Sequence, residues 1–150
     1  MNSAKLELAF RQHLISQMKG FWDCFINREN NLNPGVPDLT YLMKDPSCEV
    51  GFLELKAVEF EWGIQIEPSQ HGWMRTFAAR TPAHFLVQVR NMVYLVPGER
   101  HDLLGNNIEE IAQWAFEIRT LRSVLPRILT DVSRRSLRVK SDLQQTVPNS

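Results

Sequence analysis

The sequence has few cysteines, no long apolar run and no net charge. The two cysteines, Cys24 and Cys48, are too few for a disulfide framework in 150 residues, and no cysteine–histidine spacing resembles a zinc site. No apolar stretch approaches the roughly 20 residues that a membrane-spanning helix needs. Residues 1–10 lack the apolar block of a secretory signal. We therefore expect a cytoplasmic protein with reduced thiols that does not act at a membrane.

The residues that are present are typical of one globular domain. Hydrophobic residues make up 43% of the chain and charged residues 23%, close to the average for soluble proteins. The charges are unevenly spread, because residues 1–118 carry 10 basic and 15 acidic side chains whereas residues 119–150 carry 7 and 2. The basic C-terminal segment indicates a polyanionic partner, although a solvated basic helix face explains it equally well.

Hydrophobic periodicity and turn-forming residues predict both helices and strands. We expect a helix over residues 4–19, an antiparallel pair of strands at 36–43 and 51–58, a helix over 69–80, strands at 84–89 and 92–96, a long helix at 107–123 and a basic helix at 126–139. This order favours an α/β fold, a small mixed sheet of about four strands flanked by α-helices, plus C-terminal helices. Residues 1–97 would form the core, 98–140 a helical extension of the same domain, and 141–150 a flexible tail.

Three charged residues in the middle of the chain have the pattern of a metal-dependent hydrolase. Side chains two apart in a strand point the same way, so Glu54 and Lys56 share one face and the apolar Leu53 and Leu55 the other. In a hairpin, Asp38 can lie beside Glu54 near one end of the sheet. Two adjacent carboxylates repel each other unless a cation lies between them, and Mg²⁺ accepts carboxylate, water and phosphate oxygens. Lys56 would then stabilise charge on a phosphate or orient an attacking water.

The same residues also have a plainer explanation. A bare E-x-K pattern is usually a pair of exposed strand charges, and Asp38 would then be a turn residue. Here the pattern lies inside an apolar strand, after Pro37 and Asp38 and before a helix. This context favours the hydrolytic interpretation.

Three motifs in order carry a resemblance to a known family. Residues 35–39 (GVPDL), 52–57 (FLELKA) and 68–73 (PSQHGW) resemble the PD-(D/E)xK nuclease superfamily. They are most similar to its small virus-type replication-repair nuclease (VRR-NUC) branch, which includes phage and bacterial enzymes similar to Holliday-junction resolvases. The resemblance covers roughly residues 4–96 and implies a restriction-endonuclease-like core. It also implies that the protein is located in the cytoplasm of a bacterial or phage-infected host cell.

The resemblance implies a role for individual residues. Asp38 and Glu54 would bind Mg²⁺ or Mn²⁺ together with the backbone carbonyl of Leu55. Lys56 would be the catalytic lysine. Gln70, in the following helix, would bond the phosphate or a metal-bound water. Many members carry a glutamate in the first helix near the site, and Glu7 matches that position by order, although a solvated helix charge is its alternative explanation.

Neighbouring residues leave alternatives open. His71 is adjacent to Gln70, but the turn of the helix would direct it elsewhere. Glu59, Glu61 and Glu67 make the neighbourhood acidic; one of them could serve a second metal ion, or all are solvated. Several arginines near the C-terminus could neutralise DNA phosphates or form a solvated helix face, namely Arg119, Arg122, Arg127, Arg134, Arg135 and Arg138.

The function that we expect is metal-dependent hydrolysis of DNA phosphodiester bonds by an endonuclease. Branched DNA such as a Holliday junction is the substrate that the resemblance suggests. Because one site cuts one strand, we expect a homodimer or a higher symmetric homo-oligomer with DNA as its partner. Three alternatives remain: a sequence-specific restriction- or homing-type endonuclease on the same fold, a non-catalytic nucleic-acid-binding module, and a protein-interaction domain in which the motif match is accidental.

Overall fold

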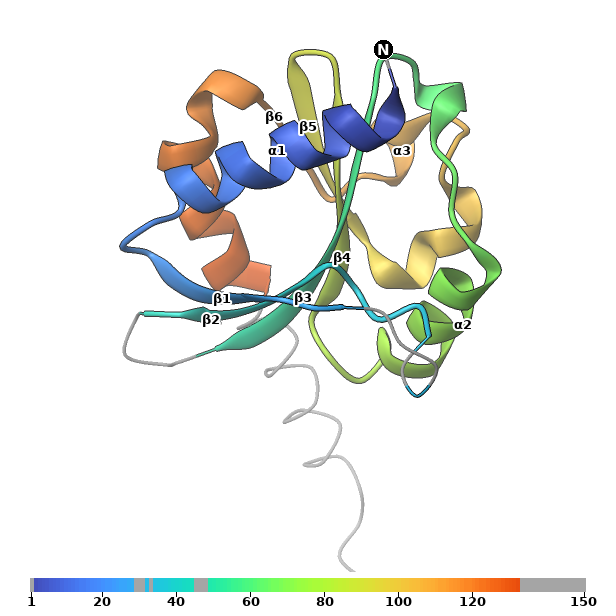
Figure 1. Ribbon diagram of the computed structural model, residues 1–150, viewed down its shortest axis with the longest axis horizontal. Helices are drawn as coiled ribbons and strands as arrows, with labels where there is room; N and C mark the ends of the chain where they lie inside the picture. Colours follow the sequence, from blue (N-terminus) through green and yellow to red (C-terminus); the bar gives the residue numbers. More distant parts are fainter. Residues whose placement is uncertain (1, 29–31, 33, 45–48, 133–150) are drawn as a thin grey trace, which may run out of the picture.

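The computed structural model describes residues 2–28, 32, 34–44 and 49–132. It contains one six-stranded sheet with the strands in chain order. The strands are β1 (Trp22–Ile26), β2 (Leu39–Met43), β3 (Val50–Val58), β4 (Ala83–Val89), β5 (Met92–Pro97) and β6 (Trp114–Glu117). Strands β3 and β4 run parallel, and every other neighbouring pair is antiparallel. The sheet is strongly twisted, so β5 stands nearly upright where β1 and β2 run across the view (Figure 1).

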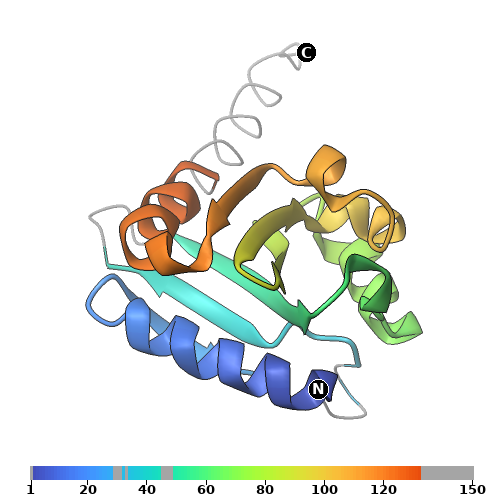
Figure 2. The same cartoon turned by 90° about the horizontal axis from the view of Figure 1, so that it is seen from above.

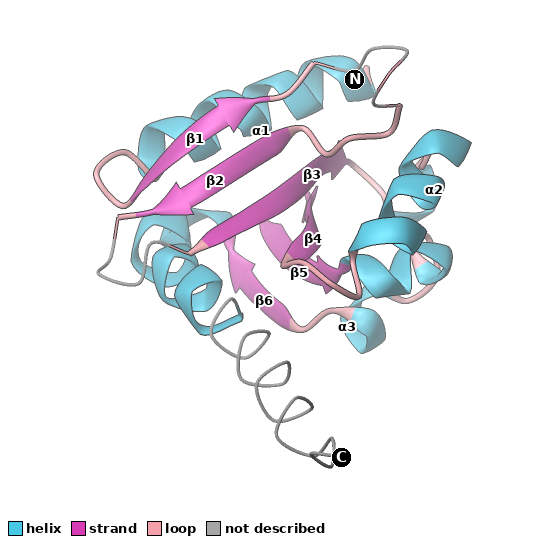
Figure 3. Cartoon of the chain, turned by 90° about the horizontal axis from the view of Figure 1, so that it is seen from below, coloured by secondary structure: helices cyan, strands magenta, loops and turns pink. Residues whose placement is uncertain are grey.

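Helices cover both faces of this sheet. Helix α1 (Ser3–Gln17) and a helix whose described part covers residues 121–132 lie over β1 and β2 (Figures 1 and 2). Helix α2 (Pro68–Phe77) and the short α3 (Ile108–Ile111) lie together on the other side (Figure 3). Three 3₁₀ helices complete the described elements: η1 (Glu61–Gly63), η2 (Gly98–Leu103) and η3 (Ile118–Thr120).

Each face of the sheet has its own apolar core. Leu53, Leu55 and Ala57 of β3 pack with buried residues of α1 and of the helix at 121–132. On the opposite face, Phe85 and Val87 of β4 pack under α2 and α3. The alternation of side chains along β3 and β4 separates the two cores, because successive strand residues point to opposite faces. None of the described helices is both long and apolar enough to cross a bilayer.

The structure confirms the α/β class, the mixed sheet and the antiparallel pairing of β2 with β3, but not the predicted number of about four strands. Strand β1 follows α1 after a tight turn at Gly20, whose φ is +93°, and pairs with β2 from Trp22–Met43 to Ile26–Leu39. Its burial is irregular, as an edge strand allows, so the period-2 pattern of a strand is weak in the sequence.

The helix predicted at residues 107–123 is wrong. Ile108–Ile111 form one turn of α-helix, β6 follows at Trp114–Glu117, and α-helix resumes only at residue 121. Here tertiary pairing overrides helical periodicity, because β5 offers an open edge. The N–H of Gln113 donates to the Leu95 carbonyl (2.8 Å) and that of Ile118 to the Asn91 carbonyl (2.8 Å), one at each end of the new strand.

Two other predicted helices differ at their ends. The helix predicted at 69–80 covers Pro68–Phe77, with Glu67 as N-cap and Pro68 at the first helical position, where a missing N–H costs nothing. The basic helix predicted to begin at 126 begins at 121. Residues 133–139 of that helix, and the tail at 141–150, lie outside the described residues.

Candidate functional site

The register of the β2–β3 hairpin brings Asp38 and Glu54 together. Leu39 pairs with Leu53, so continuing the antiparallel ladder by one residue places Asp38 opposite Glu54. The Asp38 N–H donates to Oε2 of Glu54 at 3.2 Å, and the two carboxyl groups are also within hydrogen-bond reach of each other. The predicted strand at 36–43 starts later than expected, at Leu39, so Asp38 lies in the bend that leads into β2.

The backbone of Leu55 holds the carboxylate of Asp38. Its N–H donates to Oδ2 of Asp38 at 2.8 Å, because β2 begins at Leu39 and has no residue of its own to pair at this height. In a strand, the N–H and C=O groups of one residue point toward the same neighbour. The Leu55 carbonyl therefore lies on the Asp38 side of β3, where the third oxygen ligand was expected.

Glu54, Lys56 and Gln70 form one polar network under α2. The Gln70 side-chain nitrogen donates to Oε1 of Glu54 at 2.8 Å. Its oxygen accepts from Nζ of Lys56 at 3.1 Å and from the N–H of Glu67 at 2.9 Å. Nζ of Lys56 also lies 3.9 Å from Oε1 of Glu54. Two donors on one side and a carboxyl group on the other determine which way the amide points.

Burial raises the pKa of carboxyl groups at this site. Only 3% of Glu54 is exposed, and its pKa is raised because it is buried, and further because Asp38 carries a like charge, while Lys56 opposes the rise. The same charged residues affect Glu7 of α1. Burial raises the pKa of Glu7, the positive charge of Lys56 lowers it, and the negative charge of Asp38 raises it further. A bound cation would stabilise the ionised form of all three carboxyl groups.

A small cavity opens beside Asp38. It has a volume of about 170 Å³ and is lined by Glu7, Leu8 and Arg11 of α1, together with Ala4, Asp38 and Leu55. Arg11 follows Glu7 by one helical turn, so it brings a cation to the edge of the acidic cluster. No motif in the sequence singles out Arg11, because its position relative to Asp38 depends on how α1 crosses β3.

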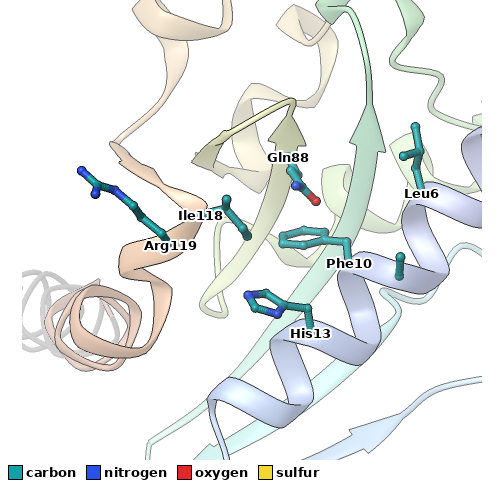
Figure 4. A pocket seen from close by; sticks show the side chains of 7 residues that line it. Leu6, Phe10, His13, Gln88, Ile118 and Arg119 are labelled. Carbon is teal, nitrogen blue, oxygen red and sulfur yellow. The ribbon is translucent and has the colours of Figure 1, made fainter.

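A larger cavity lies elsewhere and has a different lining. Its volume is about 350 Å³, and its walls come from α1, β4 and the region of η3, including Phe10, His13, Gln88 and Ile118 (Figure 4). Among the described residues no carboxylate lines it, so they do not offer the ligands that a hard metal ion requires there. The smaller cavity is the one that adjoins the polar network.

Asn27 positions the site and was not predicted from the sequence. It follows β1 directly and donates through its side chain to the Pro37 carbonyl (3.0 Å) and to Oγ1 of Thr40 (2.8 Å). Its N–H also donates to the Asp38 carbonyl at 2.8 Å. These bonds hold the bend around Asp38 from the side of β1. Since β1 itself was not predicted, nothing in the sequence indicated this role.

Gly35 brings the segment before Asp38 against α2. Its φ is +76°, and a Cβ at this position would lie 1.9 Å from the Ser69 carbonyl oxygen. Only glycine combines that backbone conformation with so close an approach. The two motifs at residues 35–39 and 68–73 are therefore in direct backbone contact.

The acidic residues after β3 have separate positions. Glu61 accepts a hydrogen bond from the N–H of Ile108, so it caps α3 rather than joining the network. Glu67 is the N-cap of α2.

His71 points away from Gln70, as expected, and its Nδ1 lies 2.7 Å from Nδ1 of His101.

The described C-terminal arginines have different surroundings. Arg122 donates to the carbonyls of Gln17 (2.8 Å) and Lys19 (3.4 Å), at the end of α1, and its guanidinium lies 5.0 Å from the centre of the Phe21 ring. Arg119 is exposed and paired with Glu117. Arg127 lines a groove with Trp114, and Arg134, Arg135 and Arg138 lie outside the described residues. The geometry thus gives Arg122 a structural role.

No protein-family model and no curated protein matches the chain. Any functional interpretation therefore depends on the geometry of the residues themselves.

Proposed function

We propose that this protein is a metal-dependent DNA endonuclease of the PD-(D/E)xK type. The single observation that carries the proposal is the convergence of Asp38, Glu54 and Lys56 where β2 begins beside the middle of β3, with Gln70 bonded to both Glu54 and Lys56. These are the residues of the three motifs that resemble the family, and they are contributed by three separate elements. A chance occurrence of the motifs would not require such contacts.

The order of elements agrees with a restriction-endonuclease-like core. Helix α1 carries Glu7, the β2–β3 hairpin carries Asp38, Glu54 and Lys56, and α2 carries Gln70. Strand β4 then returns parallel to β3. The close approach of Gly35 to Ser69 joins the first and third motifs and supports interpreting them as one unit.

The donor set fits a hard divalent cation. Asp38, in the bend before β2, and Glu54 of β3 supply carboxylate oxygens. The Leu55 carbonyl lies on the same side of β3 as its N–H, which already contacts Asp38. Mg²⁺ and Mn²⁺ accept such oxygens and keep water for the remaining positions. Bound there, the ion would polarise a phosphoryl oxygen and lower the pKa of a water ligand. Glu7 adds negative charge at the edge of the cavity.

The cations of the site would act on the phosphate. Lys56 is held between Gln70 and Glu54, so its ammonium group is preorganised to stabilise negative charge that develops on a phosphoryl oxygen. Arg11, which lines the same cavity, could contact a second phosphate oxygen. Gln70 keeps Lys56 and Glu54 in position through its two hydrogen bonds.

The test is nicking of supercoiled plasmid DNA in Mg²⁺ or Mn²⁺. We expect the wild type to nick the plasmid. Asp38→Asn and Lys56→Met should each nick it at least about 100-fold more slowly. Asp23→Asn and Lys44→Met are matched controls, because these two exposed residues form an aspartate–lysine pair (3.7 Å) outside the site. Circular dichroism verifies that each variant is folded.

The substrate is tested by comparing a four-way junction, a matched duplex and single-stranded DNA. Preference for the junction would support a resolvase-like enzyme, and both strands would then be cut by a homodimer or a larger symmetric oligomer. Site-specific cuts in a duplex would support the restriction- or homing-type alternative. If no DNA is cut in either metal, the hydrolase proposal is wrong and the non-catalytic binding module becomes the better explanation.

A further inference from the structure

A second polar cluster lies where α2 meets η2 and shares no residue with the site of Asp38 and Glu54. It joins His71 of α2 with His101 and Asp102 of η2. The Nδ1 atoms of the two histidines are 2.7 Å apart, and Oδ1 of Asp102 lies 3.1 Å from Nδ1 of His101 and 3.6 Å from Nδ1 of His71. Within the described part of the chain, no other three histidine, cysteine or acidic side chains converge in this way.

The spacing of these atoms is that of ligands around one small ion. In a tetrahedral zinc site with bonds of about 2.0–2.1 Å, two ligand atoms lie roughly 3.3 Å apart. The three observed separations, 2.7, 3.1 and 3.6 Å, lie on both sides of that value. Shifts of a few tenths of an ångström would therefore place all three atoms at bonding distance from one ion.

The surroundings hold two of the three ligands in place. His101 is buried, with 6% of the residue exposed, and the start of η2 is packed tightly, because a Cβ on Gly98 would lie 2.6 Å from Sδ of Met74 and 2.8 Å from the Ala83 carbonyl. His71 is fixed by its place in α2. The side chain of Asp102 is 72% exposed, which leaves solvent access for water to complete the coordination.

The hydrogen positions of the two histidines would differ between the metal-free and the metal-bound cluster. Without an ion, one Nδ1 must donate its hydrogen to the other, since two lone pairs at this distance repel each other. With an ion, both rings carry their hydrogen on Nε2 and present both Nδ1 lone pairs to the metal. With both rings neutral, this change moves one hydrogen from Nδ1 to Nε2 of a single ring and releases none.

We propose that His71, His101 and Asp102 bind one first-row transition-metal ion of the zinc class, with water in the remaining position. Two imidazole nitrogens select against Mg²⁺, which prefers oxygen ligands, and in favour of Zn²⁺, Co²⁺ or Ni²⁺. The ion would link α2 to η2, because His71 lies in α2, next to Gln70, and the other two ligands lie in η2. The site is distinct from that of Asp38 and Glu54 and does not depend on nuclease activity.

The test is binding of Co²⁺ and Zn²⁺ to the full chain after removal of metals with a chelator. We expect one ion per chain, visible absorption from tetrahedral Co²⁺ that Zn²⁺ abolishes, and a Zn²⁺-dependent rise in melting temperature. Asp102→Asn removes a ligand from an exposed position, so it should fold normally and bind at least roughly 10-fold more weakly. His101→Asn should lose the absorption.

Controls separate this site from other metal ligands. His13→Asn removes an exposed histidine that lines a different cavity, and Asp38→Asn removes a carboxylate of the nuclease site; both should bind Co²⁺ as the wild type does. The proposal is overturned if the wild type binds less than one ion, or if Asp102→Asn and His101→Asn bind Zn²⁺ as tightly as the wild type.

Discussion

Gln70 is the residue on which both buried charges of β3 depend. Its amide donates to Glu54 and accepts from Lys56, so the two charged groups are held in one orientation even though they lie 3.9 Å apart rather than in direct hydrogen-bond contact. The carboxyl group of Glu54 is also bonded by the Asp38 N–H. At the residue scale, therefore, an uncharged side chain organises the charged ones.

Replacing Gln70 by alanine should weaken both stability and activity. It removes one hydrogen bond from each of two buried polar groups, which costs about 1–3 kcal/mol of unfolding free energy. It also leaves Lys56 less constrained, which should slow nicking by roughly 10–100-fold. Urea unfolding and plasmid nicking measure the two effects. The exposed Gln65→Ala is the control and should change neither. A Gln70→Ala variant with the wild-type nicking rate would contradict the positioning role.

His84 should make the protein sensitive to acid. Burial lowers its pKa to about 4, although a hydrogen bond with Gln113 opposes the shift. The unfolded chain has a histidine pKa near 6.5 and therefore binds a proton that the folded chain excludes, so stability is complete above about pH 6.5 and falls between pH 6.5 and 4 by up to roughly 3 kcal/mol.

The measurement is urea unfolding of the wild type and of His84→Gln at several values between pH 7.5 and pH 4.5. We expect the variant to be less stable than the wild type at neutral pH but to lose less stability on acidification. His13→Gln, which changes an exposed histidine, should retain the full pH dependence. Equal slopes for the wild type and His84→Gln would show that another group is responsible.

At the scale of elements, two glycines near the site have opposite requirements. Gly35 has a φ of +76° and lies against the Ser69 carbonyl, so it joins the bend before β2 to the start of α2. Gly72 lies inside α2, and a Cβ there would meet no atom within 4 Å. The first glycine is required by the close approach of two motifs, whereas the second only reduces helix propensity.

Alanine at these two positions should have effects of opposite sign. Gly35→Ala introduces a backbone clash and a strained φ, and we expect it to destabilise the protein by more than about 1 kcal/mol and to impair nicking. Gly72→Ala should stabilise α2 by roughly 0.5–1 kcal/mol. Thermal unfolding of both variants tests the pair. If Gly35→Ala were as stable as the wild type, the motifs would not be held together at this point.

At the scale of the whole molecule, the C-terminal segment serves both the core and the charge balance. The helix at 121–132 contributes Leu125, Ile128, Leu129 and Val132 to the main core, and Arg122 ties it to the end of α1. Residues 133–150, by contrast, carry four basic side chains and one acidic one. Arg122 therefore contributes to the fold, whereas the positive charge of residues 133–150 can be removed without removing these core side chains.

Two truncations should distinguish these roles. Ending the chain after Val124 removes four buried aliphatic side chains worth about 2–5 kcal/mol each, so the protein should not fold. Ending it after Val132 keeps them, and we expect a folded protein with weaker DNA binding. Its logarithmic salt dependence should be shallower by about 0.9 for each DNA phosphate that the shortened chain leaves unneutralised. Fluorescence anisotropy at several salt concentrations measures this, and an unchanged slope would exclude a role for residues 133–150 in binding.

Local pattern alone predicted the placement of two residues of the candidate site. The alternation from Leu53 to Ala57 was enough to place Glu54 and Lys56 on one face of a strand, and the turn residues at 44–49 were enough to predict a hairpin with the preceding strand. The edge strands were not predictable in the same way. A strand with one open edge and one exposed face, such as β1, keeps little of the period-2 pattern, and β6 forms at the open edge of β5.

The sequence by itself determined the α/β class, the hairpin of β2 and β3 and the sharing of one face by Glu54 and Lys56, because each follows from neighbours a few residues apart. Only the tertiary structure decided that Asn27 bonds the bend at Asp38, that Gly35 touches Ser69, and that His71 meets His101. Those contacts join segments up to 34 positions apart along the chain. They depend on how strongly the sheet twists and on where each helix crosses it, which no local pattern encodes.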